Sequence, residues 1–310
     1  MKPEATPRDK LVVAHPERKA QRTLQRLVGA TMCPVEVVAD IPSLLAAIDS
    51  SAIAVVDAGL AREHAELRTH EARGWIAVPG EGLTPADAAC ITALLAAGWD
   101  HVVAQPMPLL AEELLATVQK LFRKDVFGLE KYMAWGAEVR SYALEDARDR
   151  EVAVAELAKD VVAVGLPDRI GSLVSVIADE LIANAVYAAP VDDAGARFRA
   201  QEPRDQSRAL TGRDAVTVRW ATDARYLAIE VRDKWGSIDI ADVMKKLAAG
   251  GSQVSEASDG GMGLSLAYAC SNQFVINVTP NVMTEVITLV DMRYKPTELA
   301  RTASFHAFRE

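Results

Sequence analysis

The chain has little cysteine, few aromatic residues and no surplus of positive charge. Its 310 residues include three cysteines, 5% aromatic residues and a net charge of −9. The cysteines, Cys33, Cys90 and Cys270, are widely spaced and form no Cys-x-x-Cys pair. This argues against a disulfide framework and a zinc site, and it fits a reducing compartment. The charge provides no broad basic face for phosphates, so nucleic acid is not an expected partner.

Long apolar runs are missing as well. The N-terminus, Met1-Lys2-Pro3-Glu4, has no apolar signal core, and no apolar run approaches the roughly 20 residues that a membrane span needs. We therefore expect a cytoplasmic protein with no membrane partner. Half of the residues are hydrophobic, which is enough for two cores, and the length of 310 residues predicts two domains.

The first half alternates short apolar runs with helical patterns. The runs lie at 11–14, 35–39, 53–56, 75–78 and 101–104. Continuous apolar strands separated by helices are typical of a parallel sheet that is covered on both faces. The sequence therefore predicts a doubly wound α/β domain over residues 9–125.

The second half predicts a separate α+β domain over residues 138–295. It is preceded by a predicted linker helix at 126–137 and followed by a C-terminal tail at 296–310. The expected elements are a strand at 139–144, helices at 151–164 and 168–189, and two antiparallel hairpins within 216–232 and 274–290. The polar residues 190–213 predict a mobile surface loop.

Two polar residues share one face of the second of these helices. Glu180 and Asn184 are four residues apart, so their side chains lie on the same side. An amide oxygen can ligate Mg²⁺, which can bridge phosphates, and a carboxylate can orient or deprotonate an attacking hydroxyl. Such a pair alone is also typical of a solvated helix surface, so its meaning depends on the segments that follow.

Two segments punctuated by glycine follow in the chain. Asp233 ends a predicted strand with Gly236 three residues later. A carboxylate there can accept a hydrogen bond from an adenine amine, and glycine lets the ring approach closely. The second segment runs from Gly261 through Gly263 and Leu264 into a predicted helix, whose free N–H groups and dipole suit phosphate. Together, the three segments predict a nucleotide pocket.

The order and approximate spacing of these segments resemble the GHKL ATPase superfamily, which includes histidine kinases, gyrase-type ATPases and anti-sigma serine kinases. The resemblance covers residues about 137 to 293 and implies an α+β sandwich of the Bergerat type, with ATP and Mg²⁺ as cofactors. By this resemblance Asn184 is the magnesium ligand, Glu180 the catalytic base and Asp233 the residue that binds adenine. The remaining cofactor-binding residues would be Gly236, Gly261, Gly263, Leu264 and Thr284.

The resemblance also implies a lid over the triphosphate. Residues 241–260 would form it, with Gly250-Gly251 as a hinge and with Lys245 and Lys246 as candidate phosphate ligands. A P-loop is excluded because the chain has no Gly-x-x-x-x-Gly-Lys-Ser/Thr. A Rossmann site is excluded because the glycines follow a lid-like loop rather than the first strand of a βαβ unit.

The first domain resembles a response-regulator receiver, which has a flavodoxin-like fold. Asp57 ends the third strand, where receivers carry the phosphorylated aspartate, and Gln105 stands where they carry lysine. Ala14-His15-Pro16 replaces the acidic residues that hold Mg²⁺. Because phosphoryl transfer needs the metal and the neutralising charge, we expect a degenerate receiver in which Asp57 is not a phosphoacceptor. Such a domain is most simply a docking or dimerisation module, so a homodimer is left open.

The second domain most resembles the anti-sigma-factor, serine/threonine-kinase branch of the superfamily. A histidine kinase needs an acceptor histidine upstream of the ATPase, and none of the five histidines falls between 102 and 305. We expect an ATP-binding bacterial signalling protein that acts on a protein partner, such as an anti-anti-sigma factor or a sigma factor. A non-catalytic ATP-dependent switch and an unorthodox histidine kinase are the alternatives.

Two features depart from the pattern of these kinases. Tyr187 stands three residues after Asn184, where the kinases usually carry a basic residue or histidine, and residues 190–213 are an insertion.

Overall fold

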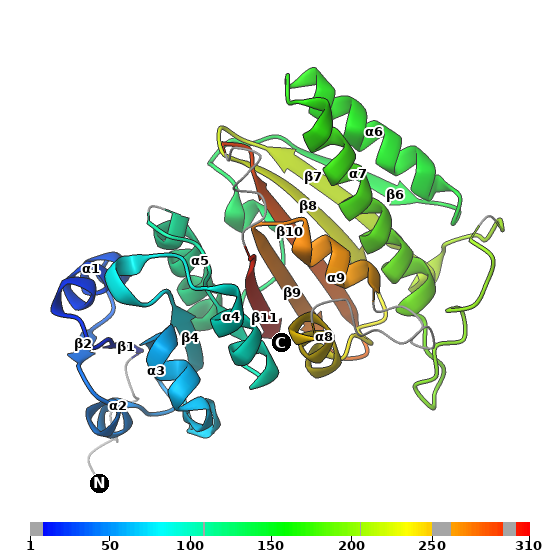
Figure 1. Ribbon diagram of the computed structural model, residues 1–310. Helices are drawn as coiled ribbons and strands as arrows, with labels where there is room; N and C mark the ends of the chain where they lie inside the picture. Colours follow the sequence, from blue (N-terminus) through cyan, green and yellow to red (C-terminus); the bar gives the residue numbers. More distant parts are fainter. Residues whose placement is uncertain (1–8, 108, 205, 250–261, 294–301) are drawn as a thin grey trace, which may run out of the picture. The chain divides into compact units, whose positions relative to one another are not determined.

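The protein divides into two compact units, Met1–Val126 and Phe127–Glu310, and each is described by itself. The computed structural model describes residues 9–107, 109–204, 206–249, 262–293 and 302–310 (Figure 1). Each unit combines helices with a sheet, so the protein belongs to the mixed α/β class.

The first unit is built on a parallel sheet with the strand order β2-β1-β3-β4-β5. Its strands are β1 (Lys10–Ala14), β2 (Val35–Val38), β3 (Ala52–Asp57), β4 (Gly74–Val78) and β5 (His101–Val102). The helices are α1 (Arg18–Gly29), α2 (Ile41–Ala47), α3 (Ala58–Glu63), α4 (Ala88–Ala96) and α5 (Leu109–Arg123), with 3₁₀ turns η1 (Ala65–Thr69) and η2 (Glu81–Leu83).

The apolar runs of the first half form the centre of this sheet. Every residue of β3 is buried, and valine, isoleucine and leucine side chains from β1, β3 and β4 pack with those of α1 and α5 in one core. Side-chain oxygens of Asp40, Asp57 and Asp87 accept backbone N–H groups at the starts of α2, α3 and α4, which satisfies donors that a helix N-terminus leaves open.

The second unit has a mixed sheet with the strand order β11-β9-β10-β8-β7-β6. The strands are β6 (Val139–Leu144), β7 (Val216–Thr222), β8 (Tyr226–Asp233), β9 (Gln273–Thr279), β10 (Met283–Asp291) and β11 (Ser304–Arg309). Neighbours are antiparallel except for β11, which runs parallel to β9.

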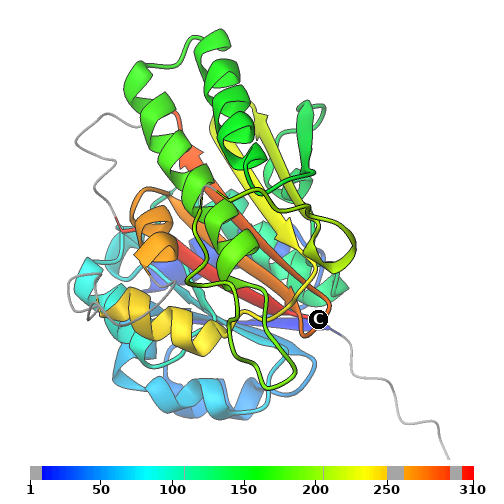
Figure 2. The same cartoon turned by 90° about the vertical axis from the view of Figure 1, so that its right-hand side faces the viewer.

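Helices cover one face of this sheet (Figures 1 and 2). They are α6 (Asp149–Ala163), α7 (Asp168–Ala183), α8 (Ile240–Ala248) and α9 (Met262–Ala269), and a π-helical turn (Asn184–Ala188) continues α7. One helical stretch, Asp168–Ala188, is long and apolar enough to cross a membrane, which the sequence argument did not anticipate. Of its most apolar window, 61% is buried inside the protein, as expected for a core helix.

The predicted linker helix at 126–137 is wrong. The segment contains a single 3₁₀ turn, η3 (Leu129–Tyr132), preceded by Gly128 with a φ of 106°. The N–H of Gly128 donates to the carboxylate of Glu285 (3.0 Å), and that of Leu129 donates to Glu230 (2.9 Å). These hydrogen bonds tie the segment to Glu285 of β10 and Glu230 of β8.

The two acceptors of this segment form a buried carboxylate pair. Glu230 and Glu285 have no exposed surface and are balanced by Arg219, whose Nη1 lies 3.1 Å from Glu230, and by Arg232, which pairs with both. Burial, with the charge of Glu285, raises the pKa of Glu230 to about 7, against the lowering effect of both arginines.

The predicted C-terminal tail at 296–310 is also wrong for its last residues. Ser304–Arg309 form β11, whose residues 304–308 are buried, and the Phe305 ring stacks on Phe274 of β9 with centroids 6.4 Å apart. Residues 304–309 therefore form a strand of the sheet.

Candidate functional site

The helix that carries Glu180 and Asn184 changes geometry at Asn184. α7 ends at Ala183, and the next five residues form a π-turn in which the N–H of Ala189 donates to the carbonyl of Asn184 at 2.8 Å. Such turns insert one residue into a helix and often occur at functional sites. Here the π-turn begins at the residue predicted to bind the metal.

Asp233 lies at the end of β8 and is buried, with 4% of its surface exposed. Its Oδ1 accepts the N–H groups of Trp235 (2.8 Å) and Gly236 (3.4 Å), and Thr284 of β10 is its neighbour across the ladder. Burial raises the pKa of the Asp233 carboxyl to about 6, although the hydrogen bonds from Trp235, Gly236 and Thr284 oppose the shift.

Gly236 has a different role from the predicted one. Its φ is +59°, and a Cβ atom there would lie 2.6 and 2.8 Å from the backbone nitrogens of Val282 and Asn281 in the β9–β10 turn. Its carbonyl accepts the N–H of Asn281 at 3.0 Å. Gly236 thus lets the strand end pack against the hairpin, and it does not line the pocket described below.

The start of α9 approaches the acid of α7. A Cβ atom on Gly263 would overlap a carboxylate oxygen of Glu180, so only glycine allows this contact without moving Glu180. The predicted Gly261 lies outside the described residues, as do 250–260 of the predicted lid and its Gly250-Gly251 hinge. The described part of that lid, 241–249, is mainly helix α8, with Val243, Met244 and Leu247 buried, rather than a loop.

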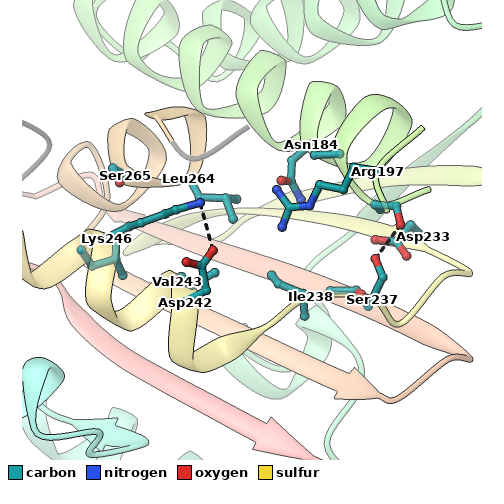
Figure 3. A pocket seen from close by; sticks show the side chains of 14 residues that line it. Asn184, Arg197, Asp233, Ser237, Ile238, Asp242, Val243, Lys246, Leu264 and Ser265 are labelled. Atoms are coloured by element: carbon teal, nitrogen blue, oxygen red, sulfur yellow. Dashed lines mark hydrogen bonds and ion pairs between the residues drawn. The ribbon is translucent and has the colours of Figure 1, made fainter. Parts of the chain in front are cut away.

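A first cavity, with about 460 Å³ of empty space, lies between α7, α8, α9 and the sheet (Figure 3). Four predicted residues line it, namely Asn184, Asp233, Leu264 and Thr284. Apolar side chains of Ile238, Val243, Leu247 and Leu264 also line it, together with charged Arg197, Asp242 and Lys246. The cavity thus joins a buried carboxyl to apolar walls, as a site for a flat heterocycle would.

A second cavity, of about 400 Å³, adjoins the first. It is lined by Glu180, Ala183, Asn184, Tyr187, Ala188, Ala200, Arg204, Gly263 and Leu264. Asn184, Ala188 and Leu264 line both cavities. Residues from five stretches of the sequence therefore line two adjoining cavities, which we together call the recess, with Asn184 in both, Asp233 in the first and Glu180 in the second.

The two lysines predicted as phosphate ligands differ in position. Lys246 lines the first cavity and pairs with Asp242 at 2.9 Å. Lys245 is exposed and lines neither cavity.

A metal at Asn184 would have few protein ligands. Among the described residues, no group of three or more His, Cys, Asp or Glu side chains is placed to hold a metal ion. Mg²⁺ is commonly bound by one or two protein oxygens together with substrate phosphates and water. The amide of Asn184, with the Glu180 carboxylate in the same cavity, fits this mode of binding.

In the first unit, a buried histidine lies beside Asp57 at the end of β3. The Nε2 of His15, which is fully buried, lies 3.4 Å from Oδ2 of Asp57, and the N–H of Leu60 donates to Oδ1 at 3.0 Å. The N–H of Glu17 donates to Nδ1 of His15 at 3.0 Å. Burial lowers the pKa of His15, although the charges of Asp57 and Glu17 oppose the shift.

No protein-family model matches the chain, and no curated protein matches it.

The insertion that follows the π-turn reaches the site. We call residues 190–214 the strap. Its Arg197 lines the first cavity and its Arg204 the second. Neither arginine was singled out from the sequence. The signal that could have found them is the concentration of five arginines in this segment, at 197, 199, 204, 208 and 213.

Proposed function

We propose that the second unit binds ATP with Mg²⁺ in a GHKL-type pocket, and that the protein is a cytoplasmic bacterial signalling regulator of the anti-sigma serine/threonine-kinase type. The observation that carries the proposal is the meeting of Asn184, Leu264, Asp233 and Thr284 around one cavity. These residues come from segments up to about 100 positions apart. The resemblance to the GHKL superfamily implied that each of them binds the nucleotide or its metal.

The base would bind at the Asp233 end. In its ionised form the carboxylate accepts a hydrogen bond from the exocyclic amine of adenine. The apolar side chains of Ile238, Val243 and Leu264 would contact the faces of the ring. Buried polar recognition of this kind discriminates strongly, because a base without the matching donor leaves the carboxylate unpaired.

The phosphates would extend past Asn184 towards Glu180. The Asn184 amide would hold Mg²⁺, which offsets the charge of the phosphate oxygens. The N-terminus of α9 at Met262–Gly263 lies beside Glu180. Its N–H groups favour an anion there.

Glu180 would act as the base for phosphoryl transfer to a protein serine or threonine. It lines the second cavity, where it can take the proton of an incoming hydroxyl. The substrate would be a protein partner such as an anti-anti-sigma factor or a sigma factor. The first unit, with Asp57 blocked by His15, would serve in docking or dimerisation.

A non-catalytic ATP-dependent switch is the second candidate. It is favoured by Tyr187, which replaces the basic residue usual in the kinases. Its hydroxyl donates to the carbonyl of Arg204 at 3.0 Å, so this side chain holds the strap. In the switch, ATP would change the surface offered to the partner without phosphoryl transfer.

Calorimetric titration of the full chain with Mg·ATP and with metal-free adenosine tests the proposal. Asn184→Ala should weaken Mg·ATP much more than adenosine, because it removes a metal ligand and leaves the base end intact. Asp233→Asn should weaken every adenine nucleotide. Asp193→Asn, at an exposed position outside both cavities, is the matched control. Unchanged ATP affinity in the first two variants would overturn the proposal, and phosphorylation of an added partner would separate the kinase from the switch.

A further inference from the structure

Two arginines of the strap line the two cavities, Arg197 the first and the exposed Arg204 the second. Figure 3 shows Arg197 entering the first cavity between Asn184 and Asp233, while Lys246 comes from α8. Arg204 lines the second cavity together with Glu180 and Gly263. The two arginines therefore follow the same direction, from Asp233 to Glu180, that the nucleotide is proposed to take.

The strap is anchored on both sides of these arginines. Phe198 packs edge-on against Trp235, with ring centroids 6.1 Å apart, and the guanidinium of Arg213 lies 4.2 Å from the centroid of the same indole. The buried Arg199 pairs with Asp214 at 2.6 Å. These contacts fix the path of the strap before any ligand binds, which reduces the entropy lost when its side chains bind one.

A second set of anchors holds the part that carries Arg204. The Tyr187 hydroxyl donates to the Arg204 carbonyl at 3.0 Å, and Ser207 donates to Asp146 at 2.6 Å. The N–H of Ala147 donates to the Arg208 carbonyl at 2.8 Å. The Arg204 carbonyl is thus bound to the π-turn, and residues 207 and 208 to the segment after β6, while Arg204 lines the second cavity.

Cationic and acidic side chains both line the recess, the acidic ones being Glu180, Asp233 and Asp242. Three cationic side chains line it among the described residues, Arg197, Arg204 and Lys246, and Lys246 is already paired with Asp242 at 2.9 Å. No ion pair joins Arg204 to Glu180 in the part of the chain that the structure describes. A guanidinium presents a planar fork of donors that matches phosphate oxygens.

We propose that the strap is a phosphate clamp, in which Arg197 binds the inner phosphates and Arg204 the terminal phosphate of a nucleoside triphosphate. This inference rests on the proposed nucleotide site. It implies that the strap makes the protein bind a nucleoside triphosphate more tightly than a diphosphate. Arg204 does so because it lies at the Glu180 end, where only the terminal phosphate would reach. Arg197 contributes to both ligands because it lies beside Asn184.

Calorimetry on the full chain with ATP and ADP, at fixed low salt and with Mg²⁺, tests the clamp. A hydrogen-bonded charge pair of this kind contributes about 1.5–3 kcal/mol, so its loss should weaken binding about 10- to 100-fold. Arg204→Ala should show this loss for ATP and a change below about threefold for ADP. Arg197→Ala should weaken both nucleotides. Asp193→Asn is the control, because Asp193 belongs to the strap, is exposed and lines neither cavity.

Inorganic triphosphate, measured in the same way, separates the clamp from the base site. Asp233→Asn should leave triphosphate binding unchanged, while Arg204→Ala should abolish most of it. Arg204→Lys, which keeps the charge and the fold but loses the planar fork, should give an intermediate loss. If the wild-type protein binds ATP and Asp233→Asn loses it, but the arginine variants bind both nucleotides like the wild type, the clamp is refuted and the nucleotide site stands. If the wild type binds neither ATP nor triphosphate, the site and the clamp both fall.

Discussion

The Asp233 carboxyl is buried from solvent. The carboxyl has a pKa of about 6 in the folded protein, against an ordinary value of 3.8. Between these two values the folded protein binds a proton that the unfolded chain does not. The contribution of this carboxyl to the free energy of unfolding therefore increases as the pH falls from about 6 to about 4, and it is smallest above pH 6.

Asp233→Asn should remove this pH dependence. The shift corresponds to about 3 kcal/mol. The stability of the wild type relative to the variant should therefore improve by roughly this amount between pH 7 and pH 4. Urea unfolding of both proteins at several pH values measures the difference, with Asp193→Asn as the exposed control. A difference that stays constant with pH would show that the carboxyl is ionised in a solvated environment.

Asp57 should not accept a phosphoryl group. His15 Nε2 lies 3.4 Å from the Asp57 carboxylate, and Gln105, which is buried, stands where the proposed resemblance to receivers implies a lysine. Incubation with acetyl phosphate and Mg²⁺, followed by mass spectrometry, should leave Asp57 unmodified, with a phosphorylation-competent receiver as the positive control. A substantial acid-labile adduct on Asp57 would contradict the expectation.

At the scale of the element, the β9–β10 turn depends on one glycine. Gly236→Ala should cost about 3 kcal/mol or more, because a left-handed residue and a backbone overlap act together. Gly195→Ala is the matched control, since Gly195 also has a positive φ (+82°) but has open space around its Cα. Its cost should be about 1–2 kcal/mol. Thermal unfolding measures both, and equal costs would mean that the contact with Thr279 and Val282 is not tight.

The elements that the sequence predicted are those with a strong apolar period. The β7–β8 hairpin alternates apolar and polar residues, and α1 and α5 have apolar residues at helical spacing. Such patterns arise from burial on one face, so they can be found without the fold. The linker was misjudged because its apolar stripe, from Phe127 to Trp135, suggested a helix, whereas its N–H groups bind Glu285 and Glu230.

The strap was misjudged because its anchors are polar and distant in sequence. Its composition predicts a mobile loop, yet the Arg199–Asp214 and Arg208–Glu202 pairs and the contacts of Phe198 and Arg213 with Trp235 order it. Only a folded chain brings these partners together. The residues of the site that the sequence pointed to were those in glycine-containing or helical motifs, whereas Arg197 and Arg204 belong to no motif.

At the scale of the molecule, the last residues are part of the core of the second unit. Phe305 and Phe308 of β11 are at most 2% exposed, and Ser304 donates to the carbonyl of Asn272 at 2.9 Å. Burying such side chains contributes about 1.5–3 kcal/mol each, in a unit whose total stability is on the order of 5–15 kcal/mol. The pattern escaped the sequence argument because six residues at a chain end carry little periodic information.

A chain that ends at residue 302 should therefore lose the cooperative unfolding of its second unit. Circular dichroism and tryptophan fluorescence would follow it through Trp220 and Trp235, which are buried in that unit. Arg309→Ala, at the exposed end of β11, should unfold like the wild type. If the truncated chain kept the wild-type transition, β11 would be an addition to the sheet rather than a part of its core.

The π-turn after α7 also sets the angle, around the helix axis, at which the following chain leaves the helix. Each residue advances an α-helix by about 100° around its axis, so the residue added at Asn184–Ala188 turns everything that follows by that angle. The strap leaves the helix from Ala189, whose carbonyl accepts a hydrogen bond from Ser237 at 2.5 Å. Without the extra residue, the chain would leave α7 about a quarter of a revolution away, and the same five arginines would start their path on another side of the helix. The one extra residue in the π-turn thus sets the direction in which the strap leaves the helix.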